Sequence, residues 1–197
     1  MSLTPSIAMN QAPLVMWKML FMKNVLAFLL LISVCFSCTK TDKYNNCEHY
    51  IRGDLSVGIK DGVPIEEVFS LFNRLDVKIS KMSIYSYTSP YPQDSLASLV
   101  SYLRTKPYFE QGTLSPNGVF LGGVILLSTH FFDMTPANQQ DWIATKNALH
   151  LTEKPGLTKS VLLKVPEGKE KIWIFKLRPY DMVVWAELNC IGSARPG

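Results

Sequence analysis

An apolar run near the start of the chain most constrains what this sequence can fold into. Val25–Phe36 (VLAFLLLISVCF) supplies twelve almost entirely apolar residues, and Lys23 precedes it. A helix needs about 20 apolar residues to cross a bilayer, so this run is too short to span one. A short apolar run behind a positive charge is typical of a secretory signal, and Met1–Ser37 contains no Asp or Glu. The sequence therefore predicts an exported protein whose signal peptide covers residues 1–37.

Two alternatives to a cleaved signal stay open, a buried N-terminal helix of a cytosolic protein and an uncleaved membrane anchor. Residues 1–21 contain Pro5 and Pro13 and lie before Met22, a second candidate start. They read as a mis-assigned start or as a long segment before the apolar run. In either case the first 37 residues are left out of the fold prediction.

The residues that follow the apolar run indicate where the signal is cut. Ser37-Cys38-Thr39-Lys40 comes directly after it. A small residue before Cys resembles the lipobox of bacterial lipoproteins, and the whole ending resembles lipoproteins of the Bacteroidota. This resemblance implies that Cys38 becomes the mature N-terminus and carries acyl chains that anchor the protein in a membrane of the cell envelope. Cys35 stands where the lipobox usually has Leu, and it is itself the alternative site.

The four cysteines suggest a disulfide rather than a metal site. Cys35 and Cys38 spell C-x-x-C, but they lie at the end of the signal, and the chain has no second such pair to complete a metal site. Cleavage at Cys38 leaves Cys47 and Cys190 as the remaining thiols, and exported proteins often join such pairs. We expect either a Cys47–Cys190 disulfide or a buried Cys190 with an unbridged Cys47 in the tether.

Charge and motifs argue against several function classes. The formal net charge is +4, and removing Lys18 and Lys23 with the signal leaves +2. Nucleic-acid binding rests on clustered cations, so we expect no nucleic-acid partner. The sequence holds no G-x-S-x-G, H-E-x-x-H, Walker or dinucleotide-binding motif, and we predict no catalytic residue, metal or cofactor. His130, three residues before Asp133, is the one pair with acid–base potential, and a lone His at a strand end is more often structural.

Apolar spacing predicts a single α+β domain over residues 51–192. Residues 38–50 are polar and read as a lipid-attached tether, and 193–197 read as a flexible tail. Two strand–helix–strand units open and close the domain, and Val57–Lys60 matches Val161–Lys164 within them. This is either a weak internal duplication or the pattern common to any two such units. Packed together, such units give a ferredoxin-like sheet with helices packed on it.

The residues between these units, 89–149, predict an inserted helix–strand–helix segment. Pro92–Lys106 has helical spacing, and Val119–His130 reads as a strand that contains a Gly pair. Thr135–Leu149 reads as a helix that a threonine caps and a proline starts. The helix of the first unit, Pro64–Arg74, places its apolar residues on one face.

Three tyrosines form a candidate binding patch, Tyr85, Tyr87 and Tyr91. If Met82 and Ile84 face the core, alternation places Tyr85 and Tyr87 together on the opposite face of a strand. Exposed tyrosines of this kind stack on sugar rings or contact peptides. The alternative is that they lie beneath the helix predicted over Pro92–Lys106.

The end of the chain carries a second resemblance. Val161–Asn189 has an apolar strand ending at Lys164, then Gly168, an amphipathic helix, and a strand ending in Ala-Glu-x-Asn. It resembles the closing half of subtilase propeptides and related protease-inhibitor modules, with Leu188 replacing the usual Pro. The match covers 29 of the 160 mature residues.

Three functions follow from these observations. The first is a non-enzymatic, lipid-anchored module that binds a protein or glycan partner in the cell envelope. The second is the protease inhibition that the propeptide resemblance implies. The third is an enzyme whose site has no recognisable motif.

Overall fold

The computed structural model describes residues 49–109, 115–155 and 159–191, which form one antiparallel sheet with α-helices packed on it. The α+β prediction is confirmed. The strands are β1 (Tyr50–Ile59), β2 (Lys78–Ser89), β3 (Asn117–Leu121), β4 (Val124–Met134), β5 (Thr152–Glu153), β6 (Lys159–Lys164) and β7 (Val183–Cys190). The α-helices are α2 (Ile65–Arg74), α3 (Leu96–Arg104), α4 (Pro136–Ala148) and α5 (Glu170–Leu177), and a short 3-10 helix (Gln93–Ser95) precedes α3.

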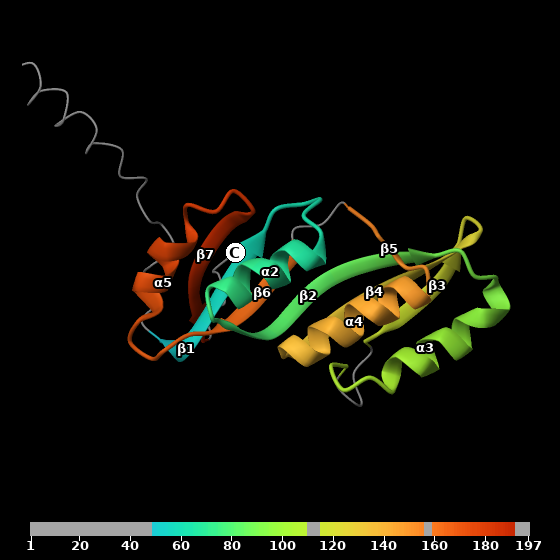
Figure 1. The fold of residues 1–197 in the computed structure, drawn as a ribbon, viewed down its shortest axis with the longest axis horizontal. Helices are drawn as coiled ribbons and strands as arrows, with labels where there is room; N and C mark the ends of the chain where they lie inside the picture. The colour runs from blue at the N-terminus through green and yellow to red at the C-terminus, as the bar shows by residue number, and fades with distance from the viewer. Residues whose placement is uncertain (1–48, 110–114, 156–158, 192–197) are drawn as a thin grey trace, which may run out of the picture. The chain divides into compact units, whose positions relative to one another are not determined.

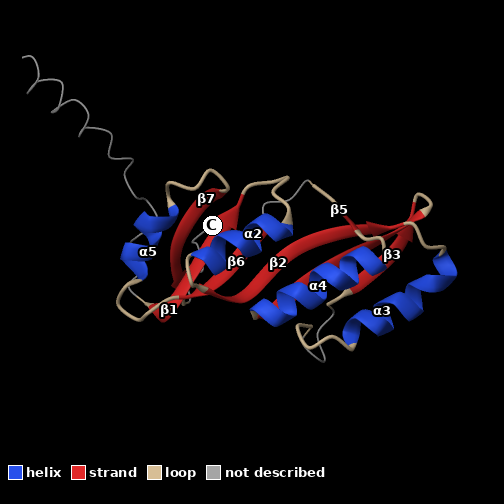
Figure 2. Ribbon diagram, in the orientation of Figure 1, coloured by secondary structure: helices blue, strands red, loops and turns tan. Residues whose placement is uncertain are grey.

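The strand order interleaves the two strand–helix–strand units. The order is β3-β4-β2-β6-β1-β7, and β5 pairs with β2 beside this path. Strand β6 lies between β1 and β2, and β1 lies between β6 and β7. Each unit, β1–α2–β2 and β6–α5–β7, therefore places one strand between the two strands of the other (Figure 2). The expectation that both units contribute to one sheet is confirmed.

The core lies between the sheet and its helices. Figure 1 shows α2 and α4 lying across the sheet. Helix α3 packs on β3, where Leu96 and Val100 fill the space that a side chain at Gly118 would need. Alternate residues of the central strands point toward the helices and are fully or almost fully buried: Leu55, Val57 and Ile59 in β1, and Val161 and Leu163 in β6.

The predicted starts of α2 and α4 agree with the structure, whereas the helix predicted from Pro92 begins at Leu96. The Thr135 side chain accepts a hydrogen bond from the Asn138 backbone N–H at 3.3 Å, and Pro136 opens α4, as the sequence predicted. Helix α2 buries Ile65, Val68, Phe69 and Phe72 on its inner face. Helix α4 therefore forms at a local start signal, and α2 forms on its apolar face.

The inserted segment differs from the prediction. Residues 119–130 do not form one strand, because Gly122 and Gly123 turn the chain between β3 and β4. Their φ angles are +61° and +84°, and two consecutive positive φ values are what a type I′ hairpin turn requires. The segment therefore contains a β-hairpin between α3 and α4 in place of the single predicted strand.

Candidate functional site

The tyrosine patch predicted on the sheet surface is wrong. Tyr85 and Tyr87 are both 0 % exposed, and Tyr91 is half-buried against the core. The register of β2 shifts once between Ile79 and Lys81 and again between Met82 and Tyr85. The second shift adds a residue to the alternation, so Tyr85 and Tyr87 turn to the same face as Met82.

The two tyrosines belong to an aromatic cluster beneath α4. Trp142 lies at its centre, 4.8 Å from Phe131 and 5.2 Å from Tyr87 between ring centroids. The Trp142 Nε1–H donates to the Tyr87 hydroxyl at 3.3 Å. Burial raises the pKa of Tyr87 well above its usual value, which keeps the phenol neutral. The covering helix is α4 rather than the helix predicted over residues 92–106, and the cluster serves packing. Its members are Tyr85, Tyr87, Tyr108, Phe109, Phe131 and Trp142.

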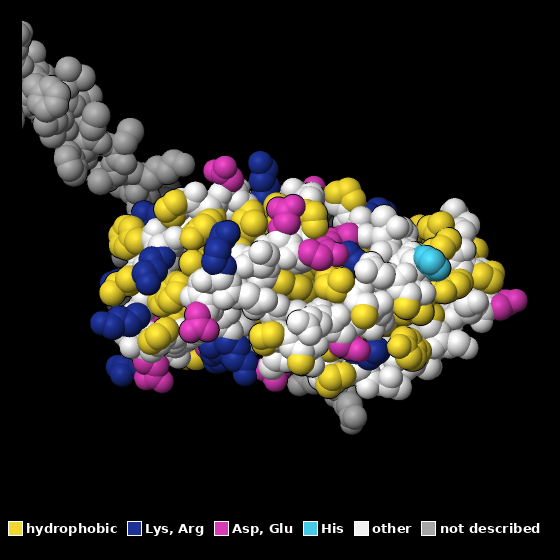
Figure 3. Space-filling model, in the orientation of Figure 1, with side chains coloured by type: hydrophobic (Ala, Val, Ile, Leu, Met, Phe, Trp, Pro, Cys, Tyr) yellow, Lys and Arg dark blue, Asp and Glu magenta, His cyan; other side chains and the backbone are white. Residues whose placement is uncertain are grey.

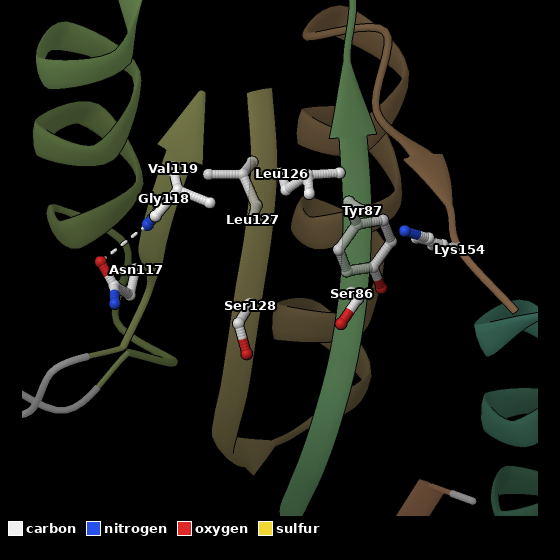
Figure 4. A pocket seen from close by; sticks show the side chains of 9 residues that line it. All are labelled: Ser86, Tyr87, Asn117, Gly118, Val119, Leu126, Leu127, Ser128 and Lys154. Atoms are coloured by element: carbon white, nitrogen blue, oxygen red, sulfur yellow. Dashed lines mark hydrogen bonds between the residues drawn. The ribbon is translucent and has the colours of Figure 1, made fainter. Parts of the chain in front are cut away.

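The opposite face of the sheet carries a row of polar side chains. Ser86 of β2 pairs in register with Ser128 of β4, which pairs with Asn117 of β3. Figure 4 shows the two serines side by side on neighbouring strands. Neither hydroxyl has a hydrogen-bond partner within the described residues, whereas the Asn117 Oδ1 accepts from the Gly118 N–H at 2.8 Å. This row therefore offers free donors and acceptors at the surface.

A shallow hollow of about 190 Å³ surrounds this row. Val119 and Leu126 line it next to the serines, and Lys154 lies at its edge, where its backbone N–H donates to the Ser86 carbonyl at 2.8 Å. Enclosed sites for small molecules have volumes of about 300–1,000 Å³, so this hollow is too small for most of them. It suits a side chain or a sugar ring of a larger partner that lies on the sheet.

A second hollow, of about 500 Å³, lies where α2 ends and α4 begins. Its amides are already engaged, because the Asn73 Nδ2 donates to the Gln139 Oε1 at 2.7 Å. Gln139 also donates to the Met134 carbonyl at 2.8 Å. These groups join the two helices to β4, so the first hollow is the better candidate for binding.

The His130–Asp133 pair carries no site. Asp133 forms a salt bridge with Lys78 at 2.7 Å. Burial and the neighbouring Lys81 lower the pKa of His130, whose side chain is half-buried. Within the described ranges, no group of three or more His, Cys, Asp or Glu side chains is placed to hold a metal ion.

A buried ion pair lies between the sheet and the start of α2. Lys159, only 2 % exposed, pairs with Glu153 and donates to the Val63 carbonyl at 2.8 Å. Glu153 accepts from the Ile65 N–H at 3.1 Å, at the first residue of α2. The carboxylate therefore accepts from a backbone N–H that has no partner within the helix. Its negative charge also interacts favourably with the positive end of the helix dipole. The Lys159 ammonium also lies 4.9 Å from the ring centroid of Tyr85.

The predicted cysteine sites fall mostly outside the described residues, which exclude Cys38 and Cys47. Cys190, at the end of β7, is disulfide-bonded, and Tyr50 is its register partner on β1. Cys190 is the single cysteine within the described ranges.

Comparisons of the chain with protein-family models, curated proteins and solved structures gave no match. Within the part of the chain that the structure describes, no helix is both long and apolar enough to span a membrane.

Proposed function

We propose that this protein is a lipid-anchored binding protein of a bacterial cell envelope. It is exported, is held at a membrane through acylated Cys38, and binds a protein or glycan partner without catalysing a reaction. The observation that carries the binding role is the pair of hydroxyls, Ser86 and Ser128, on the sheet face opposite the helices. Neither has a partner within the described residues, and apolar side chains flank both.

The order of sequence features supports the lipid anchor. Lys23, the apolar run, Ser37 before Cys38, and a polar stretch follow one another as lipoprotein processing requires. The first strand begins at Tyr50, so twelve residues, from Cys38 to His49, are left for a tether. Several acyl chains anchor a protein stably where one chain binds only marginally.

We assign the disulfide partner of Cys190 to Cys47. Tyr50 faces Cys190 in the β1–β7 register, and Cys47 precedes Tyr50 by three residues. The Ile191 N–H also donates to the His49 carbonyl at 2.9 Å, which holds His49 beside the end of β7. A bridge here would close a loop of more than a hundred residues. In the chain-entropy model, closing such a loop stabilises the folded state by about 4–5 kcal/mol.

Protease inhibition is the second candidate, and the strand order favours it over an unrecognised enzyme. The order β2-β6-β1-β7 supports a ferredoxin-like arrangement, and the propeptide-like residues Val161–Asn189 cover most of β6, all of α5 and most of β7. A fold does not fix a function, so inhibition needs its own evidence. A panel of proteases from the same envelope separates the candidates, since an inhibitor acts there below micromolar concentration and a partner-binding module does not.

The binding face is tested with Ser128→Arg. Glycan and peptide arrays are both probed with the detergent-solubilised full protein. The array that binds the protein identifies whether its partner is a glycan or a protein. A bulky cation at Ser128 covers the hollow, so we expect binding to fall at least about tenfold, the size of a strong interface contact. The matched control is Ser101→Arg on exposed α3, which should bind as the parent does. Equal binding by both variants would contradict the assignment of this face.

A further inference from the structure

Helix α5 exposes apolar side chains that the fold does not use. Five of its eight residues are apolar, but only Ile174 and Leu177 among these are buried. Ile172 and Phe175 are 49 % and 61 % exposed. They stand three residues apart, so they share one face of the helix.

Cations surround this apolar pair. Lys169, Lys171 and Lys176 are exposed, and the Arg178 guanidinium lies 4.8 Å from the ring centroid of Phe175. Figure 3 shows basic and hydrophobic side chains side by side over α5, at the left of the view. A surface that mixes Lys and Arg with large apolar side chains is typical of helices that lie on anionic membranes.

Glu167 is exposed before this stretch, but the acid within it, Glu170, does not offset the positive charge at the surface. Glu170 separates Lys169 from Lys171 in sequence, but its side chain is 2 % exposed and points inward. Its Oε1 accepts from the Gly53 N–H at 2.7 Å and the Gly168 N–H at 3.0 Å. Burial opposes its ionisation, but these backbone N–H groups outweigh burial and lower the pKa of Glu170.

The same contact places α5 near the point where the chain enters the domain. Gly53, which Glu170 contacts, lies three residues after the start of β1 at Tyr50. The twelve residues from Cys38 to His49 span at most about 40 Å when fully extended. A membrane that holds Cys38 is therefore within reach of α5.

We infer that α5 rests on the anionic surface of the membrane that holds the anchor, with Ile172 and Phe175 among the lipids and the three lysines toward the headgroups. The inference rests on the proposed function for the anchor at Cys38. The charge of the surface and its place near the start of β1 favour lipid over a protein partner. The domain is thereby oriented on the membrane rather than free to turn about its tether.

The test uses lipid-borne quenchers and two matched tryptophan variants of the full, anchored protein. Phe175→Trp places a reporter on α5, and Tyr102→Trp places one on α3, at a side chain that is 47 % exposed. Each variant is reconstituted into phosphatidylglycerol–phosphatidylcholine vesicles with and without brominated acyl chains. We expect the added emission of Phe175→Trp to be quenched and that of Tyr102→Trp to persist. Subtracting the parent emission removes the contribution of the native tryptophans.

Charge removal supplies the second arm. In Phe175→Trp, changing Lys169, Lys171 and Lys176 to Gln should lower the ratio of docked to undocked domain on the order of 100-fold, about fivefold for each lysine. Vesicles of phosphatidylcholine alone should have a similar effect. Quenching that is absent in every vesicle, or unchanged by the Gln variants, would overturn the inference. If the reporter of Phe175→Trp loses solvent exposure as protein concentration rises and without vesicles, α5 binds a second copy of the chain, which would also overturn it.

These outcomes are separable from failure of the anchor. The mass of the reconstituted protein shows whether Cys38 carries acyl chains. An acylated protein without quenching refutes the docking of α5 alone. A protein without acyl chains refutes the anchor, whatever the quenching result.

Discussion

Replacing Lys159 with Ala is expected to lower the free energy of unfolding by about 3–5 kcal/mol, because the Glu153 carboxylate would stay buried without its cation. Lys159 is 2 % exposed and joins β6 to both Glu153 and the Val63 carbonyl, next to the start of α2. Urea denaturation of the detergent-purified protein, followed by near-UV circular dichroism, measures the change.

Two further variants show whether the burial of the pair is responsible. Lys78→Ala breaks the exposed bridge to Asp133, which should change the free energy of unfolding by no more than about 1 kcal/mol. Lys159→Met combined with Glu153→Gln removes both charges and keeps an acceptor for the Ile65 N–H. We expect this pair of changes to recover part of the loss, since neutralised buried pairs are often tolerated. Equal losses for Lys159→Ala and Lys78→Ala would show that the pair behaves as a surface bridge.

Replacing Trp142 with Ala is expected to cost about 3–5 kcal/mol of unfolding free energy. Trp142 is 0 % exposed and packs against Tyr87 and Phe131, so its removal leaves a cavity beneath α4 and frees the Tyr87 hydroxyl. The same urea titration, combined with the loss of near-UV aromatic signal, measures the effect.

The matched control for this cavity is Trp173→Ala. Trp173 is half-buried on α5 and lies beside Lys176, 4.5 Å from its ammonium to the ring centroid. Its removal opens no enclosed cavity, so Trp173→Ala should lower the free energy of unfolding by much less than Trp142→Ala does. A larger cost for Trp173→Ala than for Trp142→Ala would contradict the placement of the core beneath α4.

The sequence predicted those parts of the fold, such as helix starts and helix faces, that depend on residues close together in the chain. Thr135 and Pro136 start α4 because a cap hydroxyl and a fixed proline φ act within a few residues. The apolar face of α2 was likewise readable from its spacing. The Gly122-Gly123 pair was an equally local hairpin signal, and the prediction of one strand overlooked it.

The candidate site depended on strand register, which the sequence does not reveal. The shift before Tyr85 depends on how β2 pairs with β4, which alternation along one strand does not show. A single extra residue exchanges the two faces of a strand. The tyrosines therefore lie in the core rather than on the predicted surface. Ser86 lies on the opposite face, which we propose for binding.

The burial of charged residues also depended on tertiary packing. Lys159 lies two residues before Val161 and four before Leu163, so alternation in β6 places it on the same buried face. This could be predicted only once β6 was known to bury one face. Its partner Glu153 lies on a two-residue strand that no pattern predicted. Glu170 lies between two lysines in the sequence, but its side chain is buried, where it accepts from the Gly53 N–H, 117 residues away in sequence.

The lipid anchor at Cys38 is the claim on which the proposed function and the orientation of α5 both depend. The most direct test is the mass of the N-terminal peptide of the protein purified from the membrane fraction of a Bacteroidota host. The proposal predicts a peptide that begins at Cys38 and is heavier than its sequence by more than one acyl chain, and a Cys38→Ser protein that lacks this mass. A membrane-bound protein that begins elsewhere, or that begins at an unmodified Cys38, would contradict it.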